Sequence, residues 1–345
     1  MAVDWSSLPG DLLRSLGDHH LAAGDIDCYM DMRSVCQSWR SAIPKPRPLG
    51  VSADLRFRPR HWVMLDEKES KVAIDGRRLF VNVSTGRFLR RRVPMLHDHH
   101  LLAASDGLLV LRGKSSPHVT RVVDPFTGSV LLGAPEVHED EHMMTVYFVA
   151  DPASGLRTVQ FPHYSDDRPQ FYVRSKVVHA GHVYVLDSAG CVFRILDTGN
   201  RPSFVYGELI TRMDFVFYGS MYYLVESAGE LLLVRLHRST AQVYKVDVER
   251  KVLECLHSIG RRALFLGFTR CLSVDADKFP SIHPNCLYLG QIYMSMEMLE
   301  YRYDLSNGGR QEDVSDGFNV NPTARLIGPV SFSFFVHDYC NFLAD

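Results

Sequence analysis

Three prolines within five residues, in the stretch "PKPRP" from 44 to 48, divide this chain into two parts with different sequence patterns. Proline disfavours helix both at its own position and at the residue before it. Before this stretch apolar residues recur at helical spacing, and after it short β-rich runs alternate with turn signals. The sequence therefore predicts a helical domain over 1–44, a stiff Pro-rich linker over 45–55 that holds the two parts apart, and an all-β domain over 56–345.

The helical part is expected to contain three short helices. The first begins at Pro9, has Asp11 in its first turn and is expected to end at Gly17. Asp25 is a suitable N-cap for a second helix, and a third is expected from about 30 to 42. Such a segment buries too little surface to be stable alone, so it either caps the rest of the chain or completes its core against another protein.

The all-β part carries a loose repeat of hairpins. Ser-Ala-Gly occurs at 188–190 and again at 227–229, each time between two β runs. Turn glycines fall at 86, 128, 155, 190 and 229, with spacings of 42, 27, 35 and 39 residues. A repeat near forty residues with hairpins inside is typical of β-propeller blades, and about five to seven blades are expected. A β-sandwich stays open as an alternative, and strands near 331–339 are expected to close the ring.

Charge is unevenly distributed. The whole chain of 345 residues has a net charge of −2, which argues against a nucleic-acid-coating protein. Residues 1–44 carry a net −3, whereas residues 45–92 carry a net +8 and include Arg90, Arg91 and Arg92. The preferred interpretation of this basic block is a solvated hairpin face, with an acidic partner or nucleic acid as the alternative.

The cysteines and the lengths of the apolar runs indicate the cellular location of the protein. Seven cysteines are dispersed without any CxxC pair, which indicates reduced thiols in a cytoplasmic or nuclear protein. The N-terminus lacks the basic and apolar regions of a signal peptide, and no run of eighteen apolar residues predicts a membrane span.

Three segments resemble chemical motifs, and each lacks the context that the chemistry needs. "HEDEH" (138–142) fits the zinc-protease pattern but lies between a proline and an expected strand instead of on a helix. "HDHH" (97–100) reads as a loop between strands, with no cysteine nearby to complete a zinc site. "GLLVLRGKSS" (107–116) has the wrong glycine spacing for a phosphate-binding loop. No catalytic residue, metal ligand or cofactor is therefore predicted.

The segment "LPGDLLRSL…AAGDIDCYMDMRSVCQSWRSAI" resembles an F-box at both of its ends. The F-box family implies docking onto a Skp-type adaptor and, through it, onto the cullin and RING subunits of an SCF ubiquitin ligase. The adaptor-binding residues implied by this resemblance are Leu8, Pro9, Leu12, Leu13, Leu16, Val35, Cys36, Trp39 and Arg40.

The remainder resembles plant F-box proteins with a C-terminal domain of unknown function 295, a β-propeller-like domain. The clearest matching pieces are "VVDPFTG" (122–128), "HAGHVYVLDSAG" (179–190) and "LFLGFTRCLSVDADKFPSIHPNCLYLG" (264–290). The expected fold class is therefore α plus all-β: a three-helix F-box followed by a propeller-like domain of antiparallel hairpins.

The function implied is that of a non-catalytic substrate receptor whose propeller binds a target protein that the sequence does not identify. Two alternatives are left open: a scaffold without a degraded client, and a propeller hydrolase or lectin with an N-terminal helical cap.

Overall fold

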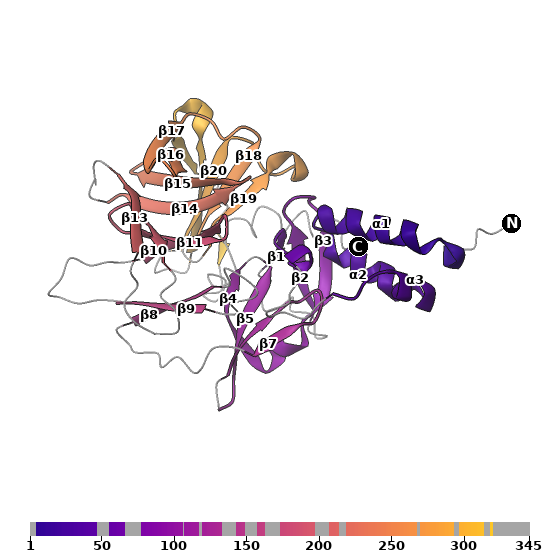
Figure 1. Cartoon of the computed structure of the whole chain (residues 1–345). Helices are drawn as coiled ribbons and strands as arrows, with labels where there is room; N and C mark the ends of the chain where they lie inside the picture. Colours follow the sequence, from indigo (N-terminus) through magenta and orange to yellow (C-terminus); the bar gives the residue numbers. More distant parts are fainter. Residues whose placement is uncertain are drawn as a thin grey trace.

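The computed structural model describes residues 5–46, 55–65, 77–105, 107–116, 119–132, 143–148, 157–162, 173–196, 207–213, 219–267, 270–292, 297–313 and 318–319. Residues 5–46, here called the helical module, contain α1 (Gly10–Ala22), α2 (Ile26–Val35) and α3 (Gln37–Ala42). Beyond this module the described elements are strands and short 3₁₀ turns (Figure 1). The predicted order, helices followed by antiparallel sheets, is confirmed.

The first helix begins as predicted but ends later. α1 starts directly after Pro9, whose carbonyl accepts a hydrogen bond from the backbone N–H of Leu13 at 3.1 Å. The prediction that Gly17 ends this helix is wrong, because α1 continues to Ala22. Gly17 is buried, and a Cβ added to it would lie 3.0 Å from the Cε2 atom of Tyr29. This glycine makes room for an aromatic ring of α2, so its role is packing.

Gly24, two residues after the end of α1, terminates this helix and has a φ of +75°. The N–H of Gly24 donates to the carbonyl of Leu21 at 3.0 Å, and the N–H of Asp25 donates to the carbonyl of His20 at 2.8 Å. These two bonds form a Schellman motif, which requires the left-handed backbone that glycine adopts at low cost.

The second and third helices divide at Cys36. The prediction of one helix from about 30 to 42 is wrong, because Cys36 has extended backbone between α2 and α3. Its sulfur accepts a hydrogen bond from the backbone N–H of Trp39 at 3.5 Å, as an N-cap of α3 does. The continuous apolar stripe concealed this break, because a stripe of that spacing does not show where one helix ends and the next begins.

The strands form sheets that follow the order of the chain. The first sheets contain β1 (Trp62–Met64), β2 (Arg77–Asn82) and β3 (Phe88–Arg92); β4 (His99–Ser105), β5 (Leu108–Gly113), β6 (Thr120–Val123) and β7 (Val130–Leu132); β8 (Met143–Phe148) and β9 (Arg157–Pro162); and β10 (Val173–His179), β11 (His182–Asp187), β12 (Cys191–Ile195) and β13 (Gly207–Arg212). The last sheet contains β14 (Met221–Ser227), β15 (Glu230–His237), β16 (Thr240–Asp247), β17 (Val252–Leu256), β18 (Arg262–Leu266), β19 (Leu272–Asp275), β20 (Cys286–Ile292), β21 (Glu297–Asp304), β22 (Arg310–Asp313) and β23 (Phe318–Asn319). Neighbouring strands pair antiparallel in the described residues, except β18 and β20, which pair in parallel.

The predicted hairpin turns are present where the structure describes them. Ser188-Ala189-Gly190 joins β11 to β12, and the turn after Ser227 joins β14 to β15. In the first turn the Asp187 carboxylate accepts the backbone N–H groups of Ala189 and Cys191 at 2.9 and 2.8 Å. The predicted turn glycine at 155 and the predicted closing strands at 331–339 lie outside the described residues.

Strands from the two ends of the described chain share one core. Buried side chains of β1 and β2 pack against those of β18, β19 and β20, and the rings of Phe265 and Tyr288 stack with centroids 4.7 Å apart. This core contains Val63, Leu65, Leu79, Val81, Ala263, Phe265, Leu272, Val274, Ala276, Phe279, Ile282, Cys286 and Tyr288. Contact between the first and last sheets is what a closed propeller ring requires.

A second core joins the helical module to the first two sheets. It contains Leu13, Leu21, Ile26, Tyr29 and Ile43 of the module together with Phe57, Trp62, Met64, Phe80, Val93, Leu109, Leu111, Val123 and Phe126. The interpretation that the proline stretch holds the two parts apart is therefore wrong. Pro46 is buried, and the Tyr29 hydroxyl donates to the carbonyl of Pro44 at 2.7 Å. Three short helices cannot bury enough surface among themselves, so their inner face packs on the strands (Figure 1).

Candidate partner-binding surface on the helical module

The outer face of the helical module exposes large apolar side chains. Leu12 and Leu16, one helical turn apart on α1, are 46% and 41% exposed, and Val35 at the end of α2 is 58% exposed. Trp5, just before α1, is 64% exposed. Four of the eight large apolar residues that are exposed in the described part of the chain thus lie within residues 5–35. Apolar side chains concentrated in this way mark a surface that another protein can cover.

The predicted adaptor-binding residues do not all lie on this surface. Leu12, Leu16, Val35, Pro9 and Arg40 are exposed, and Leu8, Cys36 and Trp39 are partly buried. Leu13 is fully buried in the core shared with the strands, so it holds α1 in place and offers no surface to a partner in this structure.

The Trp39 side chain, one of the predicted adaptor-binding residues, does not face away from its own chain. Trp39 packs against the edge of the core shared with the strands. Its indole Nε1–H donates to the carbonyl of Trp5 at 2.9 Å. Trp5 is missing from the predicted set, although a tryptophan just before an amphipathic helix is a usable signal for an anchor residue.

Arg40 is hydrogen-bonded to the preceding helix, α2. Its Nε–H donates to the carbonyl of Arg33 at 3.0 Å, and the Arg33 guanidinium donates back to the carbonyls of Arg40 and Ile43. These bonds fix the angle between α2 and α3, so Arg40 positions the surface as well as lying on it.

The β2–β3 hairpin holds the inner face of the module. Arg87, in the turn of this hairpin, forms an ion pair with Asp27 of α2 and lies over the Trp62 ring at 5.7 Å. The Trp62 indole N–H donates to the carbonyl of Gly24 at 3.3 Å. Asn82 Nδ2 donates to Asp25 Oδ1 at 3.3 Å. Helices and hairpin are therefore joined by polar bonds as well as by the apolar core.

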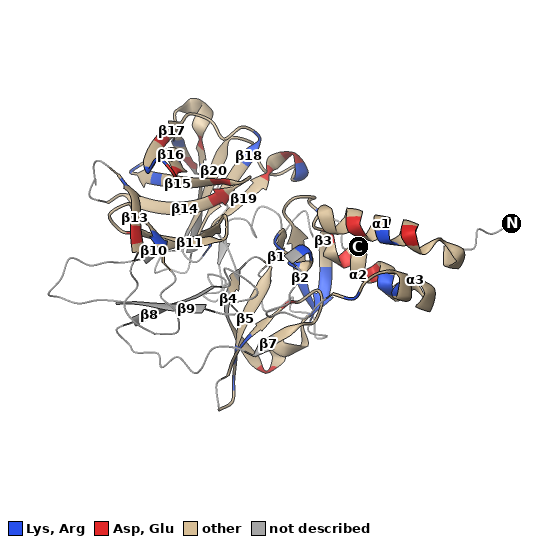
Figure 2. Ribbon diagram, viewed as in Figure 1, with Lys and Arg blue, Asp and Glu red and all other residues tan. Residues whose placement is uncertain are grey.

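Part of the basic block over residues 45–92 makes contacts within the molecule. Register places Arg78 opposite Arg91, although like charges directly opposite one another are unfavourable. The Arg91 guanidinium donates to the carbonyls of Pro125 and Phe126 at 2.8 and 2.6 Å and lies over the Phe126 ring. Figure 2 shows basic residues along β2 and β3, beside the helices. The predicted solvated hairpin face is therefore wrong for Arg91, whose guanidinium joins the first sheet to the second through these bonds.

Burial shifts the pKa of several groups in this region. Burial lowers the pKa of Arg91, an effect that the charges of Asp31 and Asp124 oppose. Burial also raises the pKa of the Asp124 carboxyl, although backbone N–H bonds from Phe126 and Thr127 oppose the rise. The pKa of the Cys28 thiol is raised by burial and, further, by the nearby carboxylates of Asp25 and Asp31.

The segments that resemble chemical motifs do not have the local structure that the chemistry needs, where the structure describes them. In "HDHH" the Nδ1 atoms of His97 and His99 contact Asp98 and the carbonyl of Met95, at 2.6 and 3.0 Å. The strand β6 follows "GKSS" where a phosphate-binding loop would open a helix. "HEDEH" lies outside the described residues. Among the described residues, a cavity of about 630 Å³ is lined by Pro94, Met95, Asp98, His99, Arg121 and Val130, of which Asp98 is the acidic one.

Among the described residues, no helix is both long and apolar enough to span a bilayer.

These features define a class of protein, a small helical module packed on a β-propeller. The chain belongs to the KIB1-4 beta-propeller family, whose model matches residues 80–313. The predicted propeller-like domain is thereby confirmed. The chain is also similar to the Arabidopsis thaliana protein named "Putative F-box protein At1g65770", with 26% identity over 351 aligned positions that cover 90% of this chain and 94% of that protein.

Solved structures with a similar arrangement have low sequence identity. One is a quinonprotein alcohol dehydrogenase-like protein from Bacteroides thetaiotaomicron, with 12% identity and a TM-score of 0.33 over 70% of this chain and 74% of that one. Another is the Malassezia sympodialis allergen Mala s 1, with 11% identity and a TM-score of 0.31 over 74% of this chain and 89% of that one. At these scores neither protein indicates a function.

Proposed function

We propose that this protein is the substrate-recognition subunit of an SCF-type ubiquitin ligase. In this proposal the helical module is an F-box that binds a Skp-type adaptor, and the propeller binds a target protein. The observation that carries the proposal is the exposure of Leu12, Leu16 and Val35 on helices whose opposite face is already buried. The F-box sequence pattern and the similarity to a protein named as an F-box protein support it.

The packing of the helices on the strands also fits a simple cap, which is the arrangement that a propeller hydrolase or lectin would have. A cap needs a buried inner face, which this module has, but it does not need exposed leucines on the outer face. Leu12 and Leu16 therefore favour the adaptor-binding role, because exposed apolar area is unfavourable until a partner covers it.

The proposed role is non-catalytic. The chain would bring its target close to the transferase and so raise the local concentration of the target, without performing chemistry itself. The adaptor would link the chain to the cullin and RING subunits, and the proposed location of the protein is the cytoplasm or the nucleus. The match to the domain of unknown function 295 stays a prediction from sequence.

The test is affinity capture of the full chain from a plant cell extract, followed by mass spectrometry. The wild type and a Leu209→Asp control, which changes an exposed leucine of β13, should both capture the adaptor and the cullin. The double variant Leu12→Asp/Leu16→Asp should lose both proteins. Equal capture by all three would overturn the proposal. A client that accumulates when the protein is depleted distinguishes a degradative receptor from a scaffold.

A further inference from the structure

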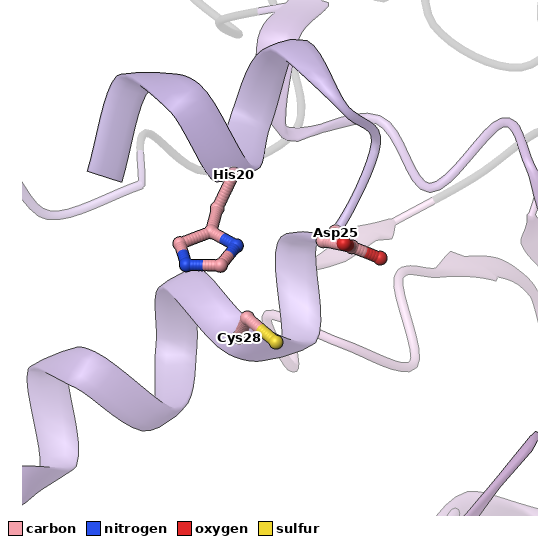
Figure 3. A group of neighbouring side chains, drawn as sticks. All are labelled: His20, Asp25 and Cys28. Carbon is pink, nitrogen blue, oxygen red and sulfur yellow. The ribbon is translucent and has the colours of Figure 1, made fainter. Parts of the chain in front are cut away.

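The corner between α1 and α2 brings together three side chains of the types that bind transition metals. The donor atoms of His20, Asp25 and Cys28 all lie within 4.8 Å of one another, and Figure 3 shows the three side chains around this corner. All three side chains are partly buried. We propose that they form a binding site for one divalent transition-metal ion of the zinc type.

Local structure places each donor at the corner. The Schellman motif at Gly24 turns the chain, and the backbone bond from Asp25 to the carbonyl of His20 fixes these two residues relative to one another. Cys28 lies three residues after Asp25, so both side chains lie on the same side of the α2 N-terminus. Asp25 occupies the N-cap position, but its side chain makes no capping hydrogen bond, so its carboxylate is available to an ion.

The donor set selects the class of ion. An imidazole nitrogen, a carboxylate oxygen and a thiolate sulfur are all ligands of Zn²⁺. Ca²⁺ and Mg²⁺ prefer oxygen ligands alone, so the histidine and the cysteine disfavour them. The donor atoms around one tetrahedral zinc ion lie about 3.5 Å apart. Side-chain rotations that shift the donor atoms by about 1 Å would therefore bring these three atoms onto one ion. Binding releases the thiol proton of Cys28 to solvent.

The β2–β3 hairpin supplies groups that orient these donors. Asn82 Nδ2 donates to Asp25 Oδ1 at 3.3 Å, and the second carboxylate oxygen can bind the ion. Arg87 Nη1 donates to the Cys28 sulfur at 2.7 Å, as outer-shell donors do to bound thiolates. The positive charge of Arg87 is balanced by its ion pair with Asp27.

The local charge favours a cation. The carboxylates of Asp25 and Asp31 act electrostatically on Cys28, while the guanidinium of Arg87 is already balanced by Asp27. A bound divalent ion would offset this excess of negative charge. Because all three ligands lie between residues 20 and 28, the ion would cross-link the end of α1 to the start of α2, at the corner that the hairpin contacts.

The test is titration of the full chain, freed of metal with a chelator, with Co²⁺ as a spectroscopic substitute for Zn²⁺. The proposal predicts one Co²⁺ per chain, a near-ultraviolet thiolate-to-cobalt charge-transfer band, and loss of the band when Zn²⁺ is added. Cys28→Ser should abolish the band, and His20→Ala should weaken Co²⁺ binding at least about tenfold.

Two matched controls change the same residue types outside the site. His19→Ala and Cys255→Ser, both at exposed positions, should keep the band and the affinity of the wild type, because neither residue belongs to the cluster. Far-ultraviolet circular dichroism checks that each variant is folded, and His20→Ala replaces Cys28→Ser as the deciding variant if the latter is not. A missing band at saturating Co²⁺, a band that survives Cys28→Ser, or equal loss in the controls would overturn the proposal.

Discussion

The guanidinium of Arg87 forms an ion pair with the carboxylate of Asp27, whose side chain is 2% exposed. The same guanidinium lies over the indole of Trp62. Arg87 lies in the β2–β3 turn and Asp27 in the second helix, so this pair joins the two parts of the chain that carry the proposed functions. The helical module and the strands are therefore expected to move and unfold as one body.

Arg87→Ala should lower the free energy of unfolding by about 1–3 kcal/mol, because it leaves a buried carboxylate without its partner. The exposure of Arg87, 39% of its side chain, keeps the loss below that of a fully buried pair. Urea unfolding measures the loss. The exposed Arg60, changed to alanine, should have an effect below about 0.5 kcal/mol, and similar losses at both positions would contradict the account.

Trp62→Ala should destabilise the chain by about 3–5 kcal/mol, because the indole is fully buried between the helices and the strands. Trp62→Phe should cost less, since it keeps most of the ring and loses the bond to the Gly24 carbonyl. Trp5→Ala is the matched control, and its exposed side chain predicts a loss below about 1 kcal/mol. Thermal unfolding of the three variants, followed by circular dichroism, should reproduce this order.

Gly17→Ala should be destabilising, although alanine is the better helix former by about 1 kcal/mol. The added Cβ would meet the Tyr29 ring at 3.0 Å, and that ring is held by Phe57 and by a hydroxyl bond to Pro44. Gly10→Ala makes the same change in the same helix with its nearest contact at 3.5 Å, so it should be neutral or stabilising. A melting temperature that rises in both variants would contradict this prediction, because it would show that the Tyr29 ring moves aside at little cost.

Asp124→Asn should change how stability depends on pH. Burial raises the pKa of the folded-state Asp124 carboxyl above its unfolded value, so its contribution to stability is full below about pH 4 and is lost as the pH rises through the raised pKa. Asparagine keeps an oxygen that can accept the Phe126 N–H, which donates at 2.8 Å, but it does not titrate. The variant should therefore lose less stability between acidic and neutral pH. Urea midpoints over this range test it, with Asp11→Asn as an exposed control.

Local turn chemistry explains why much of the strand order could be predicted. Ser188-Ala189-Gly190 forms its turn through Asp187 and a left-handed glycine, and both are visible in the sequence. Packing between residues that are distant along the chain could not be predicted from the sequence. Whether Gly17 ends a helix or accommodates a ring depends on Tyr29, twelve positions further on.

That error concealed the cluster of possible metal ligands. With α1 expected to end at Gly17, nothing placed His20 in the last turn of α1, before the corner that leads to Asp25 and Cys28. The proline stretch likewise predicted separation, because composition indicates stiffness but not what a segment packs against. The two parts are in contact because the core that contains Trp62 and Phe126 buries apolar surface from both.

Adaptor docking on the helical module is tested by the dissociation constant of the full chain with a purified Skp-type adaptor, measured by isothermal titration calorimetry. The wild type and the Leu209→Asp control should both show saturable one-to-one binding. Leu12→Asp and Leu16→Asp should each weaken it at least about tenfold, since each buries a charge where the wild type buries a leucine. No binding by the wild type, or equal dissociation constants for all four chains, would contradict the claim that this surface docks the adaptor.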